Sequence, residues 1–283
     1  MLFTLWTDDV ALAHAAAEAG VARIGPDLET LGKRSRQPQG DNRVSMHDAA
    51  SLAVLRPVIG PGRLHVRTNP VHPRFAVELE QLLDAGVTSV MLPMVRSVDQ
   101  AAGVATQLRG RAELIVMVEH ADALPIADTI ASIDGVAALY VGANDLARSL
   151  GRHTRFSVLG SDLIERVADA AHRHARGFGF FGVAWPGATS LPVESDLVYA
   201  EQVRLGADLI VLARTFGATP DNVASRLDAA RVQLDVWRQR SPGERAAARA
   251  ALRHQCAATE ARAATQPHDE PTGARSGRLR PGR

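Results

Sequence analysis

The sequence has a single cysteine, Cys256, in 283 residues. No disulfide can therefore form within the chain, and a reducing compartment such as the cytoplasm is the expected location. Aromatic residues make up only 4% of the chain, so the core must be built from Ala, Val, Leu and Ile, which favours a layered α/β fold over an aromatic-rich β-sandwich. No apolar run reaches the roughly 18 residues of a membrane span. The N-terminus, MLFTLWTDD, lacks the basic and long apolar regions of a signal peptide.

The formal net charge of the chain is also small, at +1. This balance argues against nucleic acid or a membrane surface as a partner. The positive charge gathers at the C-terminal end, where residues 240–283 contain nine arginines and four acidic residues. A basic tail could contact an acidic partner, although a solvated extension explains it as well.

Short apolar segments alternate eight times with longer stretches of helical periodicity. Ala- and Leu-rich stretches such as DVALAHAAAEAG end in glycine, as amphipathic helices often do. Eight such units predict a closed (β/α)₈ TIM barrel, whereas a doubly wound open sheet is the alternative. No G-x-G-x-x-G follows the first strand, which disfavours a nucleotide-binding version of that alternative. The expected strands are residues 2–6, 23–28, 63–67, 89–93, 113–118, 138–142, 178–183 and 208–213.

The barrel pattern predicts one catalytic domain over residues 1–239. The remainder, residues 240–283, is an Ala/Arg-rich tail that begins with a helical pattern, GERAAARAALRHQ. Roughly its last 20 residues have too little apolar content to order themselves, and we expect them to be disordered.

Polar side chains follow successive apolar strands at the same end. In a barrel of this type the chemistry lies where the strands reach their C-terminal ends. The residues at these positions are Asp27, Glu29, Arg67, Asn69, Glu119, Asn144, Asp145 and Arg214.

Glu119 and Asp145 are one β/α repeat apart and should be neighbours across adjacent strands. Each alone has an ordinary explanation, since Asp145 could cap a helix and Glu119 could pair with an arginine. Together, two close carboxylates predict a hard divalent cation such as Mg²⁺, which takes one or two protein carboxylates plus substrate oxygens. Such a site suits a 2-oxo acid, and Arg67 would place a cation near the oxygen that gains charge on enolisation.

The only lysine, Lys33, distinguishes between two aldolase mechanisms. A Schiff-base aldolase needs a lysine inside the barrel, usually in a desolvated position. Lys33 instead lies in the arginine-flanked loop ETLGKRSRQPQGDNR. A metal-assisted enolate mechanism needs no lysine and is therefore preferred.

The sequence resembles the HpcH/HpaI aldolase/citrate lyase family of pyruvate-handling barrels from about residue 2 to 218. It is most similar to the branch with a DLE-x-x-GK-x-x-RQ motif, which reads DLETLGKRSRQ here. The other matching segments are VSMHDAASL, HVRTNP, AGVTSVMLPM, VEHADAL, VGANDLARSLG and YAEQVRLGADLIVLARTF.

The resemblance implies a TIM barrel, a homo-oligomer and a divalent metal (Mg²⁺, Mn²⁺ or Co²⁺) held by Glu119 and Asp145. It also implies that Arg67 binds the pyruvyl or enolate oxygen and that His47, near the start of the second helix, acts as acid and base. A solvated His47 is the ordinary alternative. The chain departs from the family at His120, where members often have threonine, and in the segment VAWPGATSLP after the seventh strand.

These expectations place the substrate against five residues. Arg67 and Asn144 lie among the polar groups at the strand ends, together with Glu29, and Pro93 lies in the LPM segment that ends strand 4. Trp185 is expected to shape the acceptor pocket. The loop 32–43, with four basic residues, could recognise an anionic substrate or form a subunit contact.

Three functions are compatible with these residues. The first is a metal-dependent aldolase that cleaves or forms a 4-hydroxy-2-oxo acid from pyruvate and an aldehyde. The second is a citrate-lyase-like or malyl-CoA-like lyase acting on an acyl thioester, although the chain shows no sign of the C-terminal lid that such enzymes tend to carry. The third is a non-catalytic barrel retained as a binding or scaffold protein, against which the joint presence of Glu119, Asp145 and Arg67 argues.

Overall fold

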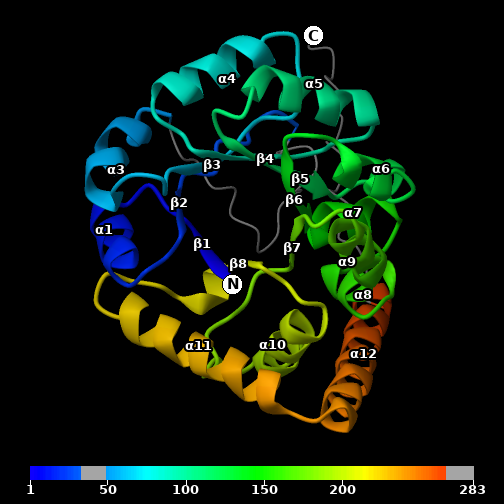
Figure 1. Ribbon diagram of the computed structural model, residues 1–283. Coiled ribbons are helices and arrows are strands. Elements are labelled where there is room, and N and C mark those ends of the chain that lie inside the picture. The colour runs from blue at the N-terminus through cyan, green and yellow to red at the C-terminus, as the bar shows by residue number, and fades with distance from the viewer. Residues whose placement is uncertain (33–48, 266–283) are drawn as a thin grey trace, which may run out of the picture.

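The computed structural model describes residues 1–32 and 49–265, and its centre is a ring of eight parallel strands surrounded by helices (Figure 1). The strand order is β2-β1-β8-β7-β6-β5-β4-β3, and every pairing is parallel. The strands are β1 (Leu2–Trp6), β2 (Arg23–Gly25), β3 (His65–Arg67), β4 (Ser89–Leu92), β5 (Glu113–Val118), β6 (Val136–Val141), β7 (Gly177–Phe180) and β8 (Leu209–Val211).

Isolated bridges between β2 and β3 bring the ends of this sheet together. Ile24 pairs with Leu64 and Asp27 with Arg67, both in the parallel sense. The predicted (β/α)₈ barrel is confirmed. Strand β2 is shorter than the expected 23–28 because Pro26 has no N–H to donate to the ladder, and pairing resumes only at Asp27.

Helices follow the strands and cover the outside of the ring, and a glycine follows the end of two of them, as the sequence indicated for Gly20. Gly20 and Gly86 have φ of +83° and +89°, the left-handed conformation that favours glycine after a helix. The helices are α1 (Val10–Glu18), α3 (Ser51–Ile59), α4 (Phe75–Asp84), α5 (Val98–Leu108), α6 (Ala127–Ser132), α7 (Ala143–Ser149), α8 (Arg155–Leu159), α9 (Leu163–Arg173), α10 (Ser195–Arg204), α11 (Val223–Gln239) and α12 (Pro242–Thr265), with 3₁₀ turns at Ala121–Ala123 and Arg214–Phe216. No helix in the described part of the chain is long and apolar enough to cross a membrane.

Alternate strand residues fill the interior of the barrel, as the two-residue period of a strand requires. A small inner cluster packs there, separate from the larger core between strands and helices. Its members are Met91, Ile115, Met117, Ala138, Tyr140, Leu209 and Val211, with Trp6 packed against them. Gly179 belongs to the same interior, where a Cβ would lie only 2.8 Å from Tyr140.

The N-terminal end of the barrel is polar. Arg23 on β2 donates to Glu113 at the start of β5, with 2.7 Å between Nη2 and Oε2. His65 is fully buried, stacks on Trp6 with 4.8 Å between ring centroids, and contacts Ser89 Oγ through Nδ1 at 3.0 Å. Burial and the nearby charge of Arg23 lower the pKa of His65 to about 3, so its ring is neutral in the folded protein.

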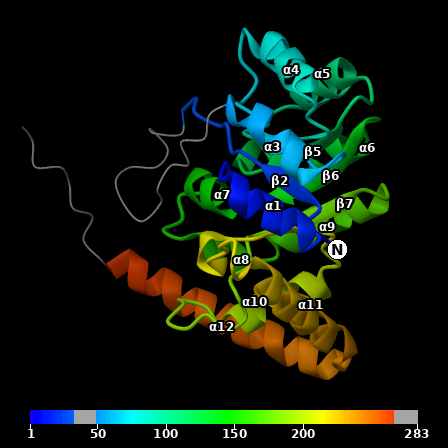
Figure 2. The ribbon, with the colours of Figure 1, turned by 90° about the vertical axis from the view of Figure 1, so that its left-hand side faces the viewer.

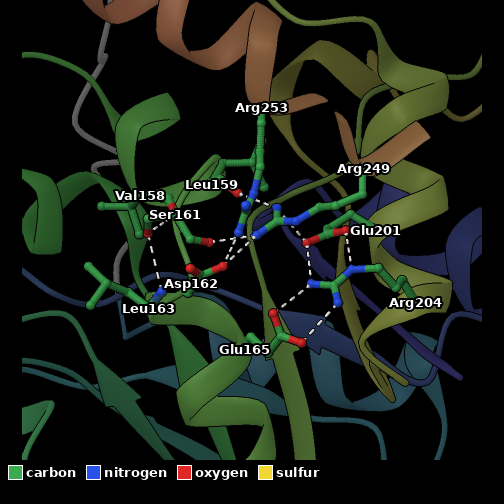
Figure 3. A network of polar contacts seen from close by, with 10 residues as sticks. All are labelled: Val158, Leu159, Ser161, Asp162, Leu163, Glu165, Glu201, Arg204, Arg249 and Arg253. Atoms are coloured by element: carbon green, nitrogen blue, oxygen red, sulfur yellow. Dashed lines mark hydrogen bonds and ion pairs between the residues drawn. The ribbon is translucent and has the colours of Figure 1, made fainter. Parts of the chain in front are cut away.

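The long helix α12 packs against α8 and α10 (Figure 2). Leu252 and Cys256 bury its inner face. Figure 3 shows a charged network at this contact, in which the buried carboxylate of Glu201 accepts from Arg204 and Arg249 at 2.8 Å each. The domain boundary at residues 239–240 stays a prediction, and the segment expected to be disordered lies almost wholly beyond residue 265, outside the described residues.

Candidate functional site

Five charged residues meet where the strands reach their C-terminal ends. Arg67 is the last residue of β3, and Glu119 directly follows β5. Asp27 and Glu29 follow β2, and Asp145 lies in the first turn of α7, just after β6. The parallel order of the strands therefore brings together side chains that are far apart in the sequence.

Arg67 is held by the two carboxylates that follow β2. Its Nε and Nη2 donate to the two oxygens of Asp27 at 2.8 and 2.5 Å, and Nε lies 3.5 Å from Glu29 Oε2. Burial alone would lower the pKa of Arg67, but the hydrogen bonds and charge of Asp27, with the charges of Glu29 and Glu119, raise it above its usual value. Arg67 is thus a permanent cation whose Nη1 donates to none of the described residues.

Glu119 is 2% exposed and accepts a hydrogen bond from the backbone N–H of Met94 at 2.8 Å. Met94 has a φ of +55°, an unusual conformation for a residue other than glycine, and it directs this N–H toward the carboxylate. Burial and the charges of Glu29 and Asp145 raise the pKa of Glu119 to about 8, although Arg67 and the Met94 N–H act in the opposite direction. A buried carboxylate beside two others is a group that a bound cation would stabilise.

The β5–β6 ladder explains how Glu119 and Asp145 come together. Val118 pairs with Val141, so Glu119 and Gly142 occupy the next positions, and the Gly142 N–H donates to Val118 O at 3.2 Å. Gly142 is also the N-cap residue of α7, which has no side-chain cap. Asp145 stands three residues further on and is not the capping residue, so the ordinary explanation for this aspartate does not apply.

The donor set fits a hard divalent cation. Glu119 offers carboxylate oxygens there, and the charges of Glu29 and Asp145 lie close enough to raise its pKa. Within residues 1–32 and 49–265, no three or more His, Cys, Asp or Glu side chains form a ready-made metal cluster. Mg²⁺ commonly takes only one or two protein carboxylates and completes its shell with waters and substrate oxygens, so an open site of this kind suits it.

The other predicted site residues lie as follows. Pro93 is buried directly before Met94, whereas Asn144 is exposed on the first turn of α7. Trp185 is half-buried after β7, and the Arg226 guanidinium lies 4.8 Å from the centroid of its ring. His47 and Lys33 lie outside the described residues, together with nearly all of the loop 32–43.

His120, the departure from the family pattern, has a local structural role. Its Nδ1 accepts from the backbone N–H of Asp122 at 3.2 Å and caps the 3₁₀ turn Ala121–Ala123. A threonine hydroxyl can cap a turn in the same way, so the substitution preserves the function of the position.

Two supporting residues were not assigned from the sequence. Met94 donates to Glu119 through its backbone N–H, a contact that no side chain in the sequence could indicate. Asn69 accepts through Oδ1 from the backbone N–H groups of Thr30 and Leu31 at 2.9 and 3.0 Å, while Glu78 of α4 accepts from both its N and its Nδ2 at 3.1 Å. Asn69 therefore fixes the segment that follows Glu29. The only signal for it was its place two residues after Arg67.

Comparisons with known proteins agree with this architecture. The family model described as HpcH/HpaI aldolase/citrate lyase matches residues 35–184. Hydroxypyruvate/pyruvate aldolase of Sagittula stellata is 34% identical over 134 residues, which cover 36% of this chain and 51% of that protein. 2-Keto-3-deoxy-L-rhamnonate aldolase of Shigella sonnei is 28% identical over 160 residues, covering 46% and 54%. The chain thus spans about half the length of these curated relatives.

Solved structures show the likeness of the fold over most of the chain. A HpcH/HpaI aldolase/citrate lyase family protein from Burkholderia cenocepacia superposes with a TM-score of 0.57 at 22% identity, covering 84% of this chain and 95% of the other. The citrate lyase beta subunit from M. tuberculosis, complexed with oxaloacetate and magnesium, superposes with a TM-score of 0.57 at 21% identity, covering 82% and 95%.

Proposed function

The chain belongs to the HpcH/HpaI aldolase/citrate lyase family, and from this premise we propose that it is a metal-dependent carbon–carbon lyase acting on a 4-hydroxy-2-oxo acid. In the cleavage direction, the C3–C4 bond breaks and the 4-hydroxyl loses its proton. The products are an aldehyde and the enolate of pyruvate, which takes up a proton at C3. In the reverse direction pyruvate and an aldehyde condense.

The observation that carries this proposal is the group of buried carboxylates around one arginine. Glu119 and Asp145 would hold a divalent cation, with Glu29 beside them. Such a cation supplies Lewis-acid polarisation of a 2-oxo acid. The chain provides the rest of the site, because Met94 orients the Glu119 carboxylate and Gly142 leaves room for it.

Arg67 is proposed to stabilise the negative charge that develops on the 2-oxo oxygen. Asp27 and Glu29 hold its guanidinium in place before substrate arrives, so no reorganisation is needed during the reaction. Nη1 makes no hydrogen bond within the described part of the chain and is the donor that can reach an oxygen of the substrate. Proton transfer is assigned to His47 or to a solvent water.

The names of relatives support the substrate class. The Sagittula stellata protein is named for hydroxypyruvate and pyruvate, and the Shigella sonnei protein for a 2-keto-3-deoxy sugar acid. We propose a small 2-oxo acid, pyruvate, and an aldehyde as the partners of this chain, and a homo-oligomer as its assembly.

The test is solvent deuterium exchange into the methyl group of pyruvate, followed by NMR, with Mn²⁺ or Mg²⁺ and with EDTA. This assay requires no knowledge of the aldehyde. We expect exchange that depends on metal and falls by roughly 100-fold or more in Glu119→Gln and Asp145→Asn, the range seen when one stabilising group is removed from an active site. Asp134→Asn, an exposed carboxylate outside the site, serves as the matched control.

Absence of exchange in a folded, metal-loaded protein would contradict the pyruvate-enolate proposal. The same samples should then be tested with acyl thioesters. Exchange that persists in EDTA and in both site variants would contradict the proposed role of the carboxylates.

A further inference from the structure

Tyr140 lies on β6, one step beneath the candidate cation site. Side chains two residues apart on a strand point to the same face, so Tyr140 points the same way as position 142. A Cβ built at Gly142 would collide with Glu119 Oε2, which shows that this direction leads toward the carboxylate. Tyr140 also pairs in register with Met117, the residue two before Glu119. It therefore occupies the barrel interior directly below Glu119.

The ring of Tyr140 has a fixed place in the inner cluster of the barrel. Gly179 on β7 leaves the space that the ring takes, since a Cβ there would lie 2.8 Å from Tyr140 Cδ2. Tyr140 is 6% exposed. The other members of the cluster are aliphatic, thioether or indole side chains, none of which is a strong hydrogen-bond acceptor. The phenol hydroxyl must therefore look beyond the cluster for a partner.

Within residues 1–32 and 49–265, the Tyr140 hydroxyl has no hydrogen-bond partner. The other tyrosine of the chain, Tyr199, donates to Ala184 O at 2.8 Å. A buried hydroxyl that finds no acceptor in its own fold costs stability and calls for an explanation such as a functional role.

The hydroxyl of Tyr140 lies within the electrostatic influence of the candidate site. Burial raises the pKa of this phenol above its usual value, Arg67 opposes the rise and Glu119 adds to it. Tyr140 therefore keeps its proton at neutral pH and is available as a hydrogen-bond donor.

We propose that the Tyr140 hydroxyl donates a hydrogen bond to the enolate of the 2-oxo acid, as a second donor beside Arg67. This inference rests on the proposed function and adds a substrate-binding residue to it. The 2-oxo group of the bound acid is a neutral acceptor, whereas the enolate oxygen carries charge and accepts more strongly. A donor that is fixed before the substrate arrives stabilises this charge without reorganisation. Tyr140 keeps its proton throughout, so the proton that C3 takes up has another source.

The test compares oxalate, a planar dianion that resembles the enolate of pyruvate, with pyruvate itself. Each is titrated by calorimetry against the wild-type protein and Tyr140→Phe in the presence of Mg²⁺. We expect the affinity for oxalate to fall by about 10-fold or more, the range for a hydrogen bond to a charged acceptor, and the affinity for pyruvate to fall by a smaller factor. In pyruvate exchange, kcat should fall while KM changes little.

Thermal unfolding distinguishes a ligand-binding hydroxyl from a structural one. Because the Tyr140 hydroxyl has no partner within the described part of the fold, Tyr140→Phe should unfold at the wild-type temperature or above it. Tyr199→Phe is the matched control, since it leaves Ala184 O without its donor. We expect Tyr199→Phe to have a lower Tm and an unchanged ratio of oxalate to pyruvate affinity.

Equal affinity of wild type and Tyr140→Phe for oxalate would overturn the inference. A lower Tm in Tyr140→Phe, with the same loss of affinity for oxalate and pyruvate, would also overturn it, because the hydroxyl would then belong to the fold.

Pyruvate exchange in the wild-type protein separates these outcomes from failure of the proposed function. If exchange is absent, the oxalate titration still decides on Tyr140. Oxalate binding that weakens in Tyr140→Phe would support the donor, and oxalate binding that is unchanged, or absent from wild type, would contradict it.

Discussion

Glu119 and Gly142 face each other at the end of the β5–β6 ladder, and the carboxylate of one occupies the space that a side chain of the other would need. A Cβ at position 142 would collide with Glu119 Oε2 and lie 2.7 Å from Glu119 Cβ. The glycine is required by this close approach and not by its backbone angles, since its φ of −84° is open to any residue. One missing side chain thus allows Glu119 to lie beside Asp145.

Gly142→Ala should therefore impair the candidate metal site without unfolding the barrel. The added methyl group must displace the Glu119 carboxylate, and we expect Mn²⁺ affinity and pyruvate exchange to fall by about 10-fold or more, as for a lost outer-shell contact. Mn²⁺ binding is measured by EPR and stability by thermal unfolding. Gly103→Ala in α5, where a Cβ would meet nothing within 4 Å, is the control. A Gly142→Ala protein with wild-type Mn²⁺ affinity would show that Glu119 does not bind the cation.

Arg67 should also contribute to folding stability. Arg67→Met removes the guanidinium that pairs with the buried carboxylates of Asp27 and Glu29, and breaking a buried pair of this kind costs about 3–5 kcal/mol. We expect the free energy of unfolding, measured with urea, to fall accordingly, whereas Arg67→Lys should cost less because the charge remains. The guanidinium of Arg67 also lies near Glu119. A Mn²⁺ ion bound at Glu119 should therefore restore part of the stability that is lost in Arg67→Met. Equal stability of the Met variant and wild type would contradict a stabilising role for these ion pairs.

The sequence predicts the barrel well because each strand has its own apolar run and each crossover its own periodicity. Strand ends were less predictable. Pro26 interrupts β2, which therefore covers only Arg23–Gly25 of the expected 23–28. Strand β8 covers only Leu209–Val211 of the expected 208–213. Apolar content alone does not indicate where the hydrogen-bond ladder stops.

At the site, sequence spacing indicated that Arg67, Glu119 and Asp145 come together, since successive strands of a barrel place their ends side by side. It could not indicate the supporting contacts. The Met94 N–H reaches Glu119 because of an unusual backbone conformation. Asn69 accepts from the backbone N–H of Thr30, more than thirty residues away in the sequence. Such contacts depend on tertiary geometry that no local pattern encodes.

His65 should make the protein sensitive to acid. The pKa of His65 is about 3 in the folded protein, whereas an ordinary histidine, as in the unfolded chain, has a pKa of 6.5. Between these two pH values the unfolded chain therefore binds a proton that the folded chain does not. This contribution to stability is complete above pH 6.5 and is lost as the pH falls toward 3, by about 1.4 kcal/mol per pH unit. His65→Asn should flatten the dependence of the free energy of unfolding on pH between 6.5 and 4, measured by urea titration at each pH. His254→Gln, an exposed histidine of α12, should leave the slope as it is. An unchanged slope in His65→Asn would mean that His65 is protonated in the fold.

The attachment of α12 should depend on Glu201 far more than on Glu165, although both carboxylates contact Arg204 (Figure 3). The side chain of Glu201 is 3% exposed and also holds Arg249 of α12, whereas that of Glu165 is 39% exposed. Glu201→Gln leaves two partly buried arginines without their shared carboxylate, a change that costs about 3 kcal/mol, while Glu165→Gln should cost less than about 1 kcal/mol. Amide hydrogen exchange over residues 242–265 should therefore speed up in Glu201→Gln and remain slow in Glu165→Gln. Equal exchange rates over residues 242–265 in the two variants would contradict the anchoring role of Glu201.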